Sequence, residues 1–382
     1  MDFDFTWLLW GLPLSFALGW LESRFDLRQW RLENRQNPRA YFRGLNHLLN
    51  ERQDEAIDAF IEAVQHDPDT SELHFALGNL FRRRGDYDRA VRVHEHLLQR
   101  GDLDDAERDR AQHALARDFL KAGLLDRAET ALRQLEGTAF EAEARLALLG
   151  IYERSRDWEQ AAEVASLLEY SGNGSFALRL AHYRCEQAEQ LRKQGQTTQA
   201  LALLETVTQQ TPTSARGWIA LADLRQSLHH TEGGLQALQQ LADHAPLHMP
   251  LVAHSLAQWA RMCDQRQAAT ERFEHYQRQH GWSLDVTRAL ASLQDDTEVG
   301  RQLYLQHLEK EPSLVMAALW LHGAHFGQPE EEQRIKTALE RSAEPLKRYR
   351  CAACGFEARQ YFWHCPGCQS WDSYPPKRVE EL

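Results

Sequence analysis

Several features that mark nucleic-acid-binding proteins and secreted, disulfide-rich proteins are scarce in this sequence. Its 44 lysines and arginines are outnumbered by 56 aspartates and glutamates, so the net charge is -12. Phosphate binding needs a basic surface, and a long nucleic-acid footprint is therefore not expected. Only six cysteines occur among 382 residues, four of them close together in the sequence. Paired thiols beside scattered single ones are typical of a reducing compartment, where disulfides do not persist.

The motifs of common enzymes are also missing. The chain has no HExxH, no GxSxG, no glycine-rich phosphate loop and no GxGxxG after a strand. His94 and His96 lie on different faces of a predicted helix, and we interpret both as surface residues rather than ligands. Cys185 lies one helical turn from His182, but nothing nearby supplies an oxyanion site, which favours a buried structural cysteine over a nucleophile. The sequence therefore predicts a protein that is not an enzyme.

One uncharged run stands near the start of the chain. From Phe5 to Leu21 the sequence is FTWLLWGLPLSFALGWL, and a helix of this length rises about 26 Å, close to the ~30 Å hydrocarbon core of a bilayer. The residues before it are acidic and those after it arginine-rich, which argues against a signal peptide. By the positive-inside rule we predict an uncleaved transmembrane anchor at residues 1–21, with its N-terminus outside the cytoplasm and the rest of the chain inside. An apolar helix docked on the body is the alternative.

Self-similarity with a period near 34 residues follows. Gly44 and Gly78 are 34 residues apart, as are Ala56 and Ala90. These positions fit the tetratricopeptide pattern, in which a helical hairpin has small residues where its two helices cross. The alanine of the second helix is predicted at Ala56, Ala90, Ala128, Ala161 and Ala200. Turns between helices are predicted at Gly85, Gly123, Gly195 and residues 229–234.

The repeats set the predicted domain organisation. After an arginine-rich juxtamembrane tether at 22–38, we expect an all-α tetratricopeptide-repeat superhelix at 39–345, with a pattern that decays after residue 250. No alternating strand pattern occurs between residues 40 and 340. The first helices of such repeats line a concave groove that binds peptides or helices. We place Asn79, Arg82 and Arg83 in that groove as candidate protein-binding residues.

The end of the chain carries the most specific motif. Cys351 and Cys354 form one CxxC pair, and Cys365 and Cys368 form a second pair ten residues later. Two such pairs supply four thiolates for one tetrahedral metal site, for which zinc is favoured and iron is the alternative. A small zinc-ribbon or rubredoxin-like domain is predicted at 346–382. Its aromatic residues are predicted to form a miniature core held together by the metal: Tyr349, Phe356, Tyr361, Phe362, Trp363, Trp371 and Tyr374.

These features together resemble one known family. The anchor, the arginine-rich tether, the repeats containing Leu77 to Arg82, and the two CxxC pairs occur in the order found in the lipopolysaccharide assembly protein B family. The resemblance implies a single-pass protein of the bacterial inner membrane with a cytoplasmic body. It also implies a rubredoxin-like C-terminal domain that packs against the repeats, with the four cysteines at the family's metal-ligand positions.

The resemblance further implies a regulatory function. Members of that family promote degradation of the deacetylase that commits precursor to lipid A, together with a membrane-anchored AAA metalloprotease, and an inner-membrane partner restrains them. The expected function is thus a non-enzymatic adaptor. Two alternatives stay open: a scaffold that couples lipopolysaccharide synthesis and transport proteins without a role in proteolysis, and a metal- or redox-sensing repeat protein. The sequence leaves homo-oligomerisation open.

Overall fold

The computed structural model describes residues 15, 16, 40–172 and 174–382. Most of the predicted anchor at 1–21 and the whole tether at 22–38 lie outside these residues. Among the helices that the structure does describe, none is both long and apolar enough to cross a bilayer. The chain divides after Ser155 into two compact units, which are described separately.

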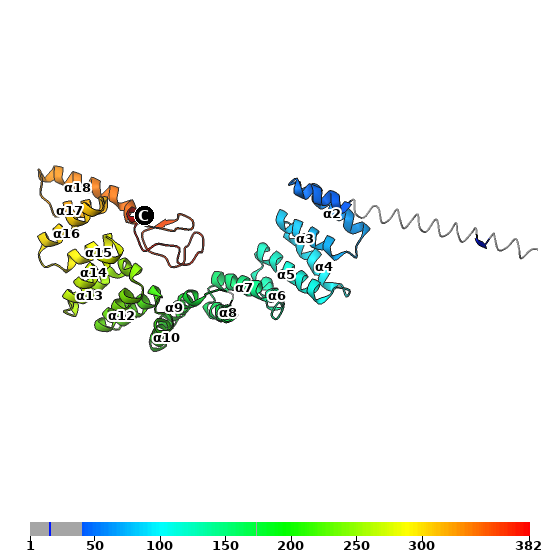
Figure 1. The fold of residues 1–382 in the computed structure, drawn as a ribbon, viewed down its shortest axis with the longest axis horizontal. Helices are drawn as coiled ribbons and strands as arrows, with labels where there is room; N and C mark the ends of the chain where they lie inside the picture. The colour runs from blue at the N-terminus through cyan, green and yellow to red at the C-terminus, as the bar shows by residue number, and fades with distance from the viewer. Residues whose placement is uncertain (1–14, 17–39, 173) are drawn as a thin grey trace, which may run out of the picture. The chain divides into compact units, whose positions relative to one another are not determined.

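Unit 1 is built from helical hairpins (Figure 1). A helical segment at 40–49 precedes the first labelled helix. The helices that follow are α2 (Gln53–His66), α3 (Ser71–Arg84), α4 (Tyr87–Gln99), α5 (Asp105–Ala122), α6 (Leu125–Arg133) and α7 (Glu141–Ser155).

Local sequence signals set where these helices begin and end. The Asp104 carboxylate accepts a hydrogen bond from the Glu107 amide at 2.7 Å and caps α5 at its N-terminus. Helices α3 and α5 end at Gly85 and Gly123, whose φ angles of 91° and 77° lie in the left-handed region that glycine adopts without strain. The turns predicted at these two glycines are confirmed.

Small residues at the predicted positions let the paired helices pack closely. The five predicted alanines of the second helices are each 0% exposed: Ala56, Ala90, Ala128, Ala161 and Ala200. At Gly78 on α3, an added Cβ would lie 2.5 Å from Nε2 of His94 on α4. At Gly44 it would lie 2.8 Å from the Phe60 ring. The crossing positions inferred from the 34-residue period are therefore real contacts between helices.

Unit 2 continues the hairpins and then changes character. Its helices are α8 (Trp158–Tyr170), α9 (Ala177–Lys193), α10 (Thr197–Gln210), α11 (Ala215–Ser227), α12 (Thr231–His244), η1 (Pro246–His248), α13 (Met249–Met262), α14 (Arg266–His280), α15 (Leu284–Leu293), α16 (Thr297–Lys310), α17 (Leu314–His322), α18 (Pro329–Ala343) and η2 (Glu344–Lys347). Although the sequence pattern decays after residue 250, α13 to α18 still form three helix pairs.

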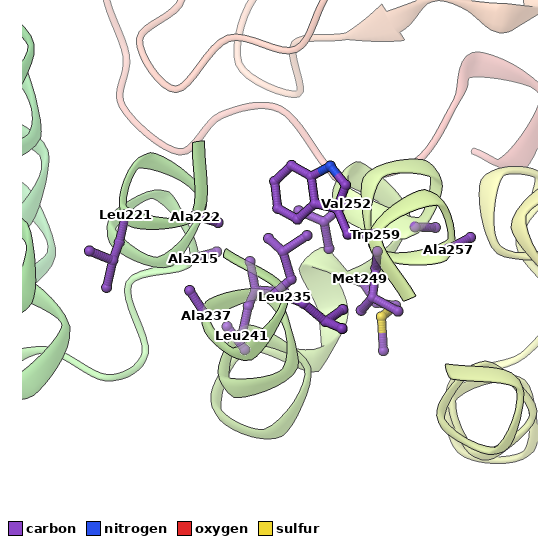
Figure 2. Close-up of a cluster of buried hydrophobic side chains, with 14 of the residues drawn as sticks. Ala215, Leu221, Ala222, Leu235, Ala237, Leu241, Met249, Val252, Ala257 and Trp259 are labelled. Atoms are coloured by element: carbon purple, nitrogen blue, oxygen red, sulfur yellow. The ribbon is translucent and has the colours of Figure 1, made fainter. Parts of the chain in front are cut away.

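The core of unit 2 lies between successive hairpins. Figure 2 shows Leu235, Val252 and Trp259 gathered between α12 and α13. Gly234 on α12 takes the small-residue position between its neighbouring helices. An added Cβ would lie 3.1 Å from the Ala222 carbonyl oxygen on α11 and 3.3 Å from the Trp259 ring on α13. Because Gly234 on α12 has no side chain, the large Trp259 ring on α13 fits against it.

The C-terminal segment is the non-helical part of unit 2. Strands β1 (Tyr349–Arg350) and β2 (Glu357–Ala358) pair antiparallel, with Tyr349 opposite Ala358, and the short helix η3 (Val379–Glu381) ends the chain. In Figure 1 this segment lies within the curve formed by α9 to α18. The predicted fold class, helical repeats with a small C-terminal zinc-ribbon-like domain, is confirmed.

Candidate metal centre and its docking face

Two knuckles with the same hydrogen-bond pattern position the four cysteines. In each knuckle the residue four positions after the first cysteine donates its amide to that cysteine's carbonyl oxygen: Gly355 to Cys351 at 2.9 Å, and Gln369 to Cys365 at 2.9 Å. The same two residues have positive φ angles, 77° at Gly355 and 60° at Gln369. Each CxxC pair is therefore held in a tight turn that aims both sulfurs at one point.

The sulfur positions fit one tetrahedral ion. The Sγ atoms of Cys351 and Cys368 are 3.8 Å apart, and those of Cys354 and Cys365 are 3.7 Å apart. All four sulfurs lie within 4.8 Å of one another. A tetrahedron with metal–sulfur bonds of about 2.3 Å has edges of about 3.8 Å. The predicted ligands are therefore brought together in an arrangement that could bind one metal ion, and this geometry suits zinc and iron alike.

Hydrogen bonding tunes the thiols unequally. Desolvation raises the pKa of Cys351, but the Ser373 hydroxyl and backbone amides of the knuckle outweigh it and lower that pKa to about 6. The Ser370 hydroxyl lowers the pKa of Cys368. A backbone hydrogen bond lowers the pKa of Cys354, yet desolvation and the three neighbouring sulfurs raise it to about 12. Four sulfurs this close cannot all be thiolates unless a cation neutralises them, which is the condition that a bound metal fulfils.

The predicted aromatic core of this module is only partly correct. Tyr349 and Tyr374 are buried, at 5% and 2% exposure, and Tyr361 donates its hydroxyl to the Tyr374 carbonyl oxygen at 2.8 Å. Phe356, by contrast, is 43% exposed. Because the module spans so few residues, the rings that do not fit around the knuckles are left for solvent or for another surface.

Trp371 and Asp372 lie against helix α9 of the repeats. Both Asp372 carboxylate oxygens are 2.9 Å from Nε2 of His182, and the His182 ring stacks on Trp371 with centroids 4.8 Å apart. A carboxylate only accepts, so Nε2 carries the proton and donates it. Desolvation lowers the pKa of His182 more than Asp372 raises it. Residues 190 positions apart in sequence form this contact, and no sequence motif indicated it.

A second tryptophan docks on the next helices. Trp363 stacks on His248 of η1, with ring centroids 5.7 Å apart, and packs against the hydrophobic core of unit 2. The Arg216 guanidinium of α11 lies 5.9 Å from the centre of the Trp371 ring. Both tryptophans thus face the repeats. They also pack within the module, Trp363 against Tyr361 with centroids 4.9 Å apart and Trp371 against His364 at 4.4 Å, so the predicted aromatic core is shared with the repeats.

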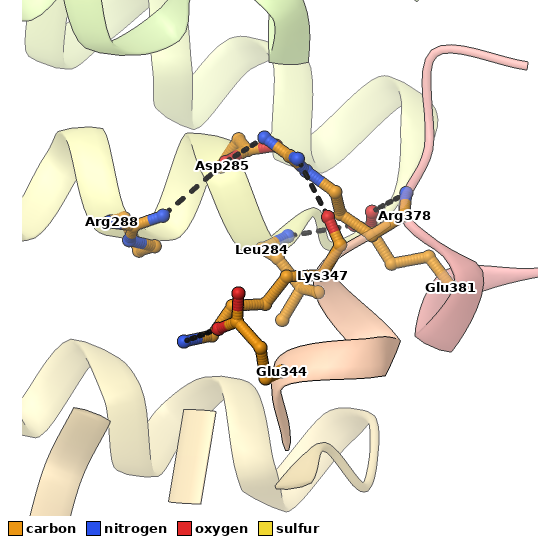
Figure 3. A network of polar contacts seen from close by, with 7 residues as sticks. All are labelled: Leu284, Asp285, Arg288, Glu344, Lys347, Arg378 and Glu381. Carbon is orange, nitrogen blue, oxygen red and sulfur yellow. Dashed lines mark hydrogen bonds and ion pairs between the residues drawn. The ribbon is translucent and has the colours of Figure 1, made fainter. Parts of the chain in front are cut away.

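Arg378 anchors the end of the chain to α15 (Figure 3). Its Nε lies 2.7 Å from one Asp285 carboxylate oxygen, its Nη2 lies 3.2 Å from the other, and its Nη1 donates to the Lys347 carbonyl oxygen at 2.8 Å. The guanidinium also stands over the Tyr349 ring at 4.1 Å. Because this bidentate pair is largely buried, its geometry fixes the direction in which the last residues leave the module.

The last two glutamates cap two repeat helices. Glu380 accepts hydrogen bonds from the Ser313 hydroxyl at 2.7 Å and the Val315 amide at 3.2 Å, at the N-terminus of α17. Glu381 accepts from the Leu284 amide at 2.8 Å, at the N-terminus of α15. Carboxylates at these ends satisfy amides that lack partners within the helix and interact favourably with its dipole. The C-terminal segment thus contacts α9, α11, α15 and α17, each the first helix of a hairpin.

The candidate groove residues lie on α3 in unit 1. Arg82 donates to the Asp118 carboxylate at 2.8 Å and to the Ala114 carbonyl oxygen at 3.2 Å, both on α5, and also pairs with the Asn79 side chain. Arg83 is exposed. The structure therefore brings Asn79 and Arg82 together between the first helices of two hairpins, whereas Arg83 points to solvent; protein binding by these residues stays a prediction.

His94 is not a surface residue, contrary to the sequence interpretation. It is 0% exposed, and its Nδ1 contacts the second oxygen of the buried Asp118 carboxylate. The small Gly78 beside it makes room for the ring. Asp118 thereby joins His94 on the second helix of one hairpin to Arg82 on the groove side, a link that helical spacing alone cannot indicate.

The thiol of Cys185 has no catalytic environment. The residue is 4% exposed, and desolvation raises its pKa to about 11, so the reactive thiolate is suppressed. The neighbouring His182 uses Nε2 for Asp372. This arrangement is that of a buried structural cysteine.

Comparisons with known proteins identify both the repeats and the metal module. A family model described as "Rubredoxin metal binding domain" matches residues 349–375, and models described as "Tetratricopeptide repeat" match residues 73–109 and 191–258. "Lipopolysaccharide assembly protein B" of Escherichia coli (strain K12) is 30% identical over 379 residues, which cover 96% of this chain and 97% of that protein. The chain belongs to the lipopolysaccharide assembly protein B family.

Two further proteins are similar to this chain at lower identity. "Lipopolysaccharide assembly protein B" of Haemophilus influenzae is 26% identical, covering 97% of this chain and 98% of that protein. A tetratricopeptide repeat protein from Parabacteroides merdae, known from its crystal structure, is 13% identical with a TM-score of 0.33, covering 67% of this chain and 98% of that one.

Proposed function

We propose that this protein is an inner-membrane adaptor that regulates lipopolysaccharide biosynthesis. It presents the deacetylase of the lipid A pathway to a membrane-anchored AAA metalloprotease for degradation, and an inner-membrane partner regulates it. In this proposal residues 1–21 are the anchor, 22–38 the tether, 39–345 the repeat body and 346–382 the metal module. The anchor places the N-terminus in the periplasm and the body in the cytoplasm.

The observation that carries this proposal is the family relationship over nearly the whole chain, whose named relatives are lipopolysaccharide assembly proteins. The helical hairpins add a fold that suits protein binding. The physical advantage of such an adaptor is effective concentration. Tethering substrate and protease to one membrane turns a three-dimensional encounter into a local one, with gains that reach about 100-fold or more.

Removal of the anchor tests the tethering step. A chain lacking residues 1–21 is expected to stay folded by circular dichroism but to leave the deacetylase stable in cells, measured as its half-life after protein synthesis is blocked. Replacing the anchor with an unrelated single-pass helix of the same topology separates tethering from specific contacts within the membrane. Normal deacetylase turnover without any anchor would refute the tethering argument.

Photo-crosslinking tests the groove. A crosslinking amino acid at Arg83, exposed on α3, is expected to capture the substrate, whereas the same amino acid at Arg92, exposed on the second helix α4, is expected not to. Equal capture from both positions would show that the groove of unit 1 does not select the substrate.

A scaffold without a role in proteolysis is the second candidate, and the word "assembly" in the names of the relatives favours it. Depletion of the protein separates the two functions. An adaptor lengthens the deacetylase half-life when it is lost, whereas a pure scaffold leaves that half-life unchanged.

We further propose that Cys351, Cys354, Cys365 and Cys368 bind one structural metal ion, with zinc favoured. Elemental analysis of the purified protein and its visible absorption spectrum distinguish the two metals, because a four-thiolate iron site is coloured and a zinc site is not. A sensor would release the metal or change its oxidation state within a cellular range, and a structural site would do neither.

A further inference from the structure

We infer that a cavity formed jointly by the repeats and the metal module is a pocket for a basic side chain, arginine or lysine, on an extended segment of a partner protein. The cavity has a volume of about 490 Å³ and lies between α9, α11 and the loop that carries Trp363. Ligand pockets typically have volumes of about 300–1,000 Å³. The inference deepens the proposed function and rests on its protein-binding part.

Apolar and polar side chains share the walls of the cavity. Ala188 on α9 and Ile219, Ala220 and Leu224 on α11 line it, and Trp363 of the metal module closes one side. These helices are the first helices of neighbouring hairpins, and such helices form the surface on which tetratricopeptide repeats receive extended peptides. An aliphatic stem of a lysine or arginine side chain would bury its methylene groups here.

Two acidic and two basic residues line the cavity, and they differ in whether they already have partners. Arg192 is held by Glu189, with Nε and Oε2 2.7 Å apart, and Arg216 is held by Glu186 at 2.6 Å. Both cations that line the cavity thus already have partners. No residue in the described part of the chain pairs with the carboxylate of Asp223, the remaining charged group of the lining.

Asp223 is therefore the group that a ligand would satisfy. Asp223 lines the cavity and is exposed, so its carboxylate is within reach of a partner, and partial desolvation by the surrounding side chains raises its pKa. An unpaired carboxylate at the wall of a partly enclosed cavity gains from a cation at hydrogen-bonding distance. A guanidinium suits it best, because its fork of N–H groups matches a carboxylate and its planar face stacks on aromatic rings such as that of Trp363.

The pocket also gives the metal module a direct part in recognition. Trp363 lies two residues before Cys365, so the knuckle that the metal would hold also positions this wall of the cavity. Docking of the module through His182 and Asp372 brings the wall to α9. Partner binding would then depend on the metal site although no ligand atom of the metal touches the partner.

The test uses a peptide pool and the full-length protein in detergent. Immobilised protein is incubated with an equimolar mixture of heptapeptides in which the central residue is arginine, lysine, glutamine or glutamate and the flanking positions are randomised. The retained peptides are identified by mass spectrometry. We expect arginine and lysine peptides to be enriched at least about 5-fold over glutamine peptides, and glutamate peptides to be depleted.

Two variants decide whether the cavity is responsible. Asp223→Asn keeps the size of the side chain and removes its charge, and it should reduce the enrichment to less than about 2-fold. Glu163→Gln, an exposed change on α8 outside the cavity, should leave the enrichment unchanged. No basic enrichment by the native protein, or enrichment that survives Asp223→Asn, would overturn the inference.

Two further outcomes are distinguishable. Free arginine or spermidine can compete for the protein as well as the retained peptides do at equal concentration. That result would show that the pocket binds small cations and would refute the inference that it binds a segment of a partner protein. The peptide preference can depend on Asp223 while Asp223→Asn leaves the deacetylase half-life in cells unchanged. That result would support the pocket and refute its role in the proposed adaptor function.

Discussion

Gly78 illustrates how a single residue sets the distance between two helices. A Cβ there would lie 2.5 Å from His94 Nε2, and His94 cannot move freely because its other ring nitrogen contacts the buried Asp118 carboxylate. Asp118 in turn holds Arg82. The glycine therefore matters less for its backbone freedom than for the polar network that it lets the two hairpins bury.

Gly78→Ala should destabilise unit 1 by about 1–3 kcal/mol, since the methyl group overpacks the interface and displaces His94. The matched control is Gly150→Ala in the interior of α7, where an added Cβ meets nothing within 4 Å. That change should stabilise the helix by about 0.5–1 kcal/mol. Urea denaturation followed by far-UV circular dichroism measures both, and equal effects of the two variants would contradict the packing argument.

The C-terminal segment shows how one short element fixes several others. Its knuckles supply the cysteine cage, its tryptophans dock on α9 and η1, and its last residues cap α15 and α17. Each contact is modest alone. Together they tie the first helices of several hairpins to a single non-helical segment, which a repeat stack based on neighbour contacts alone would not do.

Loss of the Glu380 carboxylate should loosen the start of α17. In Glu380→Ala the Val315 amide loses its acceptor, and loss of such a cap costs about 0.5–2 kcal/mol. Local opening of this helix end should become more frequent, and hydrogen exchange of a peptide that covers residues 313–318 should therefore become roughly 10-fold faster. Glu330→Ala, an exposed glutamate in the first turn of α18, is the control and should leave that peptide unchanged.

Metal removal should undock the module without unfolding the repeats. In Cys365→Ser the cage loses a ligand, and a segment this short lacks the core to stay folded alone. We expect the bound metal to fall below one equivalent and the emission of Trp363 and Trp371 to shift to the red as both rings become hydrated. Far-UV circular dichroism should retain nearly all helical signal; its collapse would show that the repeats depend on the module.

At the scale of the whole molecule, buried and half-buried histidines couple stability to pH. Desolvation lowers the pKa values of five histidines spread over both units: His74, His113, His182, His248 and His307. A base with a lowered pKa binds its proton less readily in the folded state than in the unfolded one. Its contribution to stability is therefore complete above the ordinary value of about 6.5 and is lost as the pH falls below it.

The melting temperature should consequently fall between pH 7.5 and pH 5.5. The raised pKa of Glu381, caused by desolvation, acts in the opposite direction. His113→Gln, in unit 1 and away from the cysteines, should reduce the fall without changing metal content. Scanning calorimetry at both pH values measures the effect, and a melting temperature that rises on acidification would contradict this sign.

The sequence by itself determined the repeating and local features of this protein. A 34-residue period reports where helices cross, because the same small residues recur at each crossing. Gly85 and Gly123, between helical stretches, indicate turns, and two CxxC pairs indicate a four-sulfur cage, because each of these signals lies within a few residues of chain. The helix pairs, the alanine positions and the clustered cysteines could all be predicted on this basis.

Only the tertiary structure decided which surfaces meet. The contact between His182 and Asp372 joins positions 190 residues apart, and that between Arg378 and Asp285 joins positions 93 apart. A histidine, an aspartate or a tryptophan carries no local signal of such a partner, so sequence reasoning places His94 at the surface and does not find the contact of Trp363 with the repeats. Long-range pairing depends on how hairpins stack in space, and that stacking is a property of the whole fold.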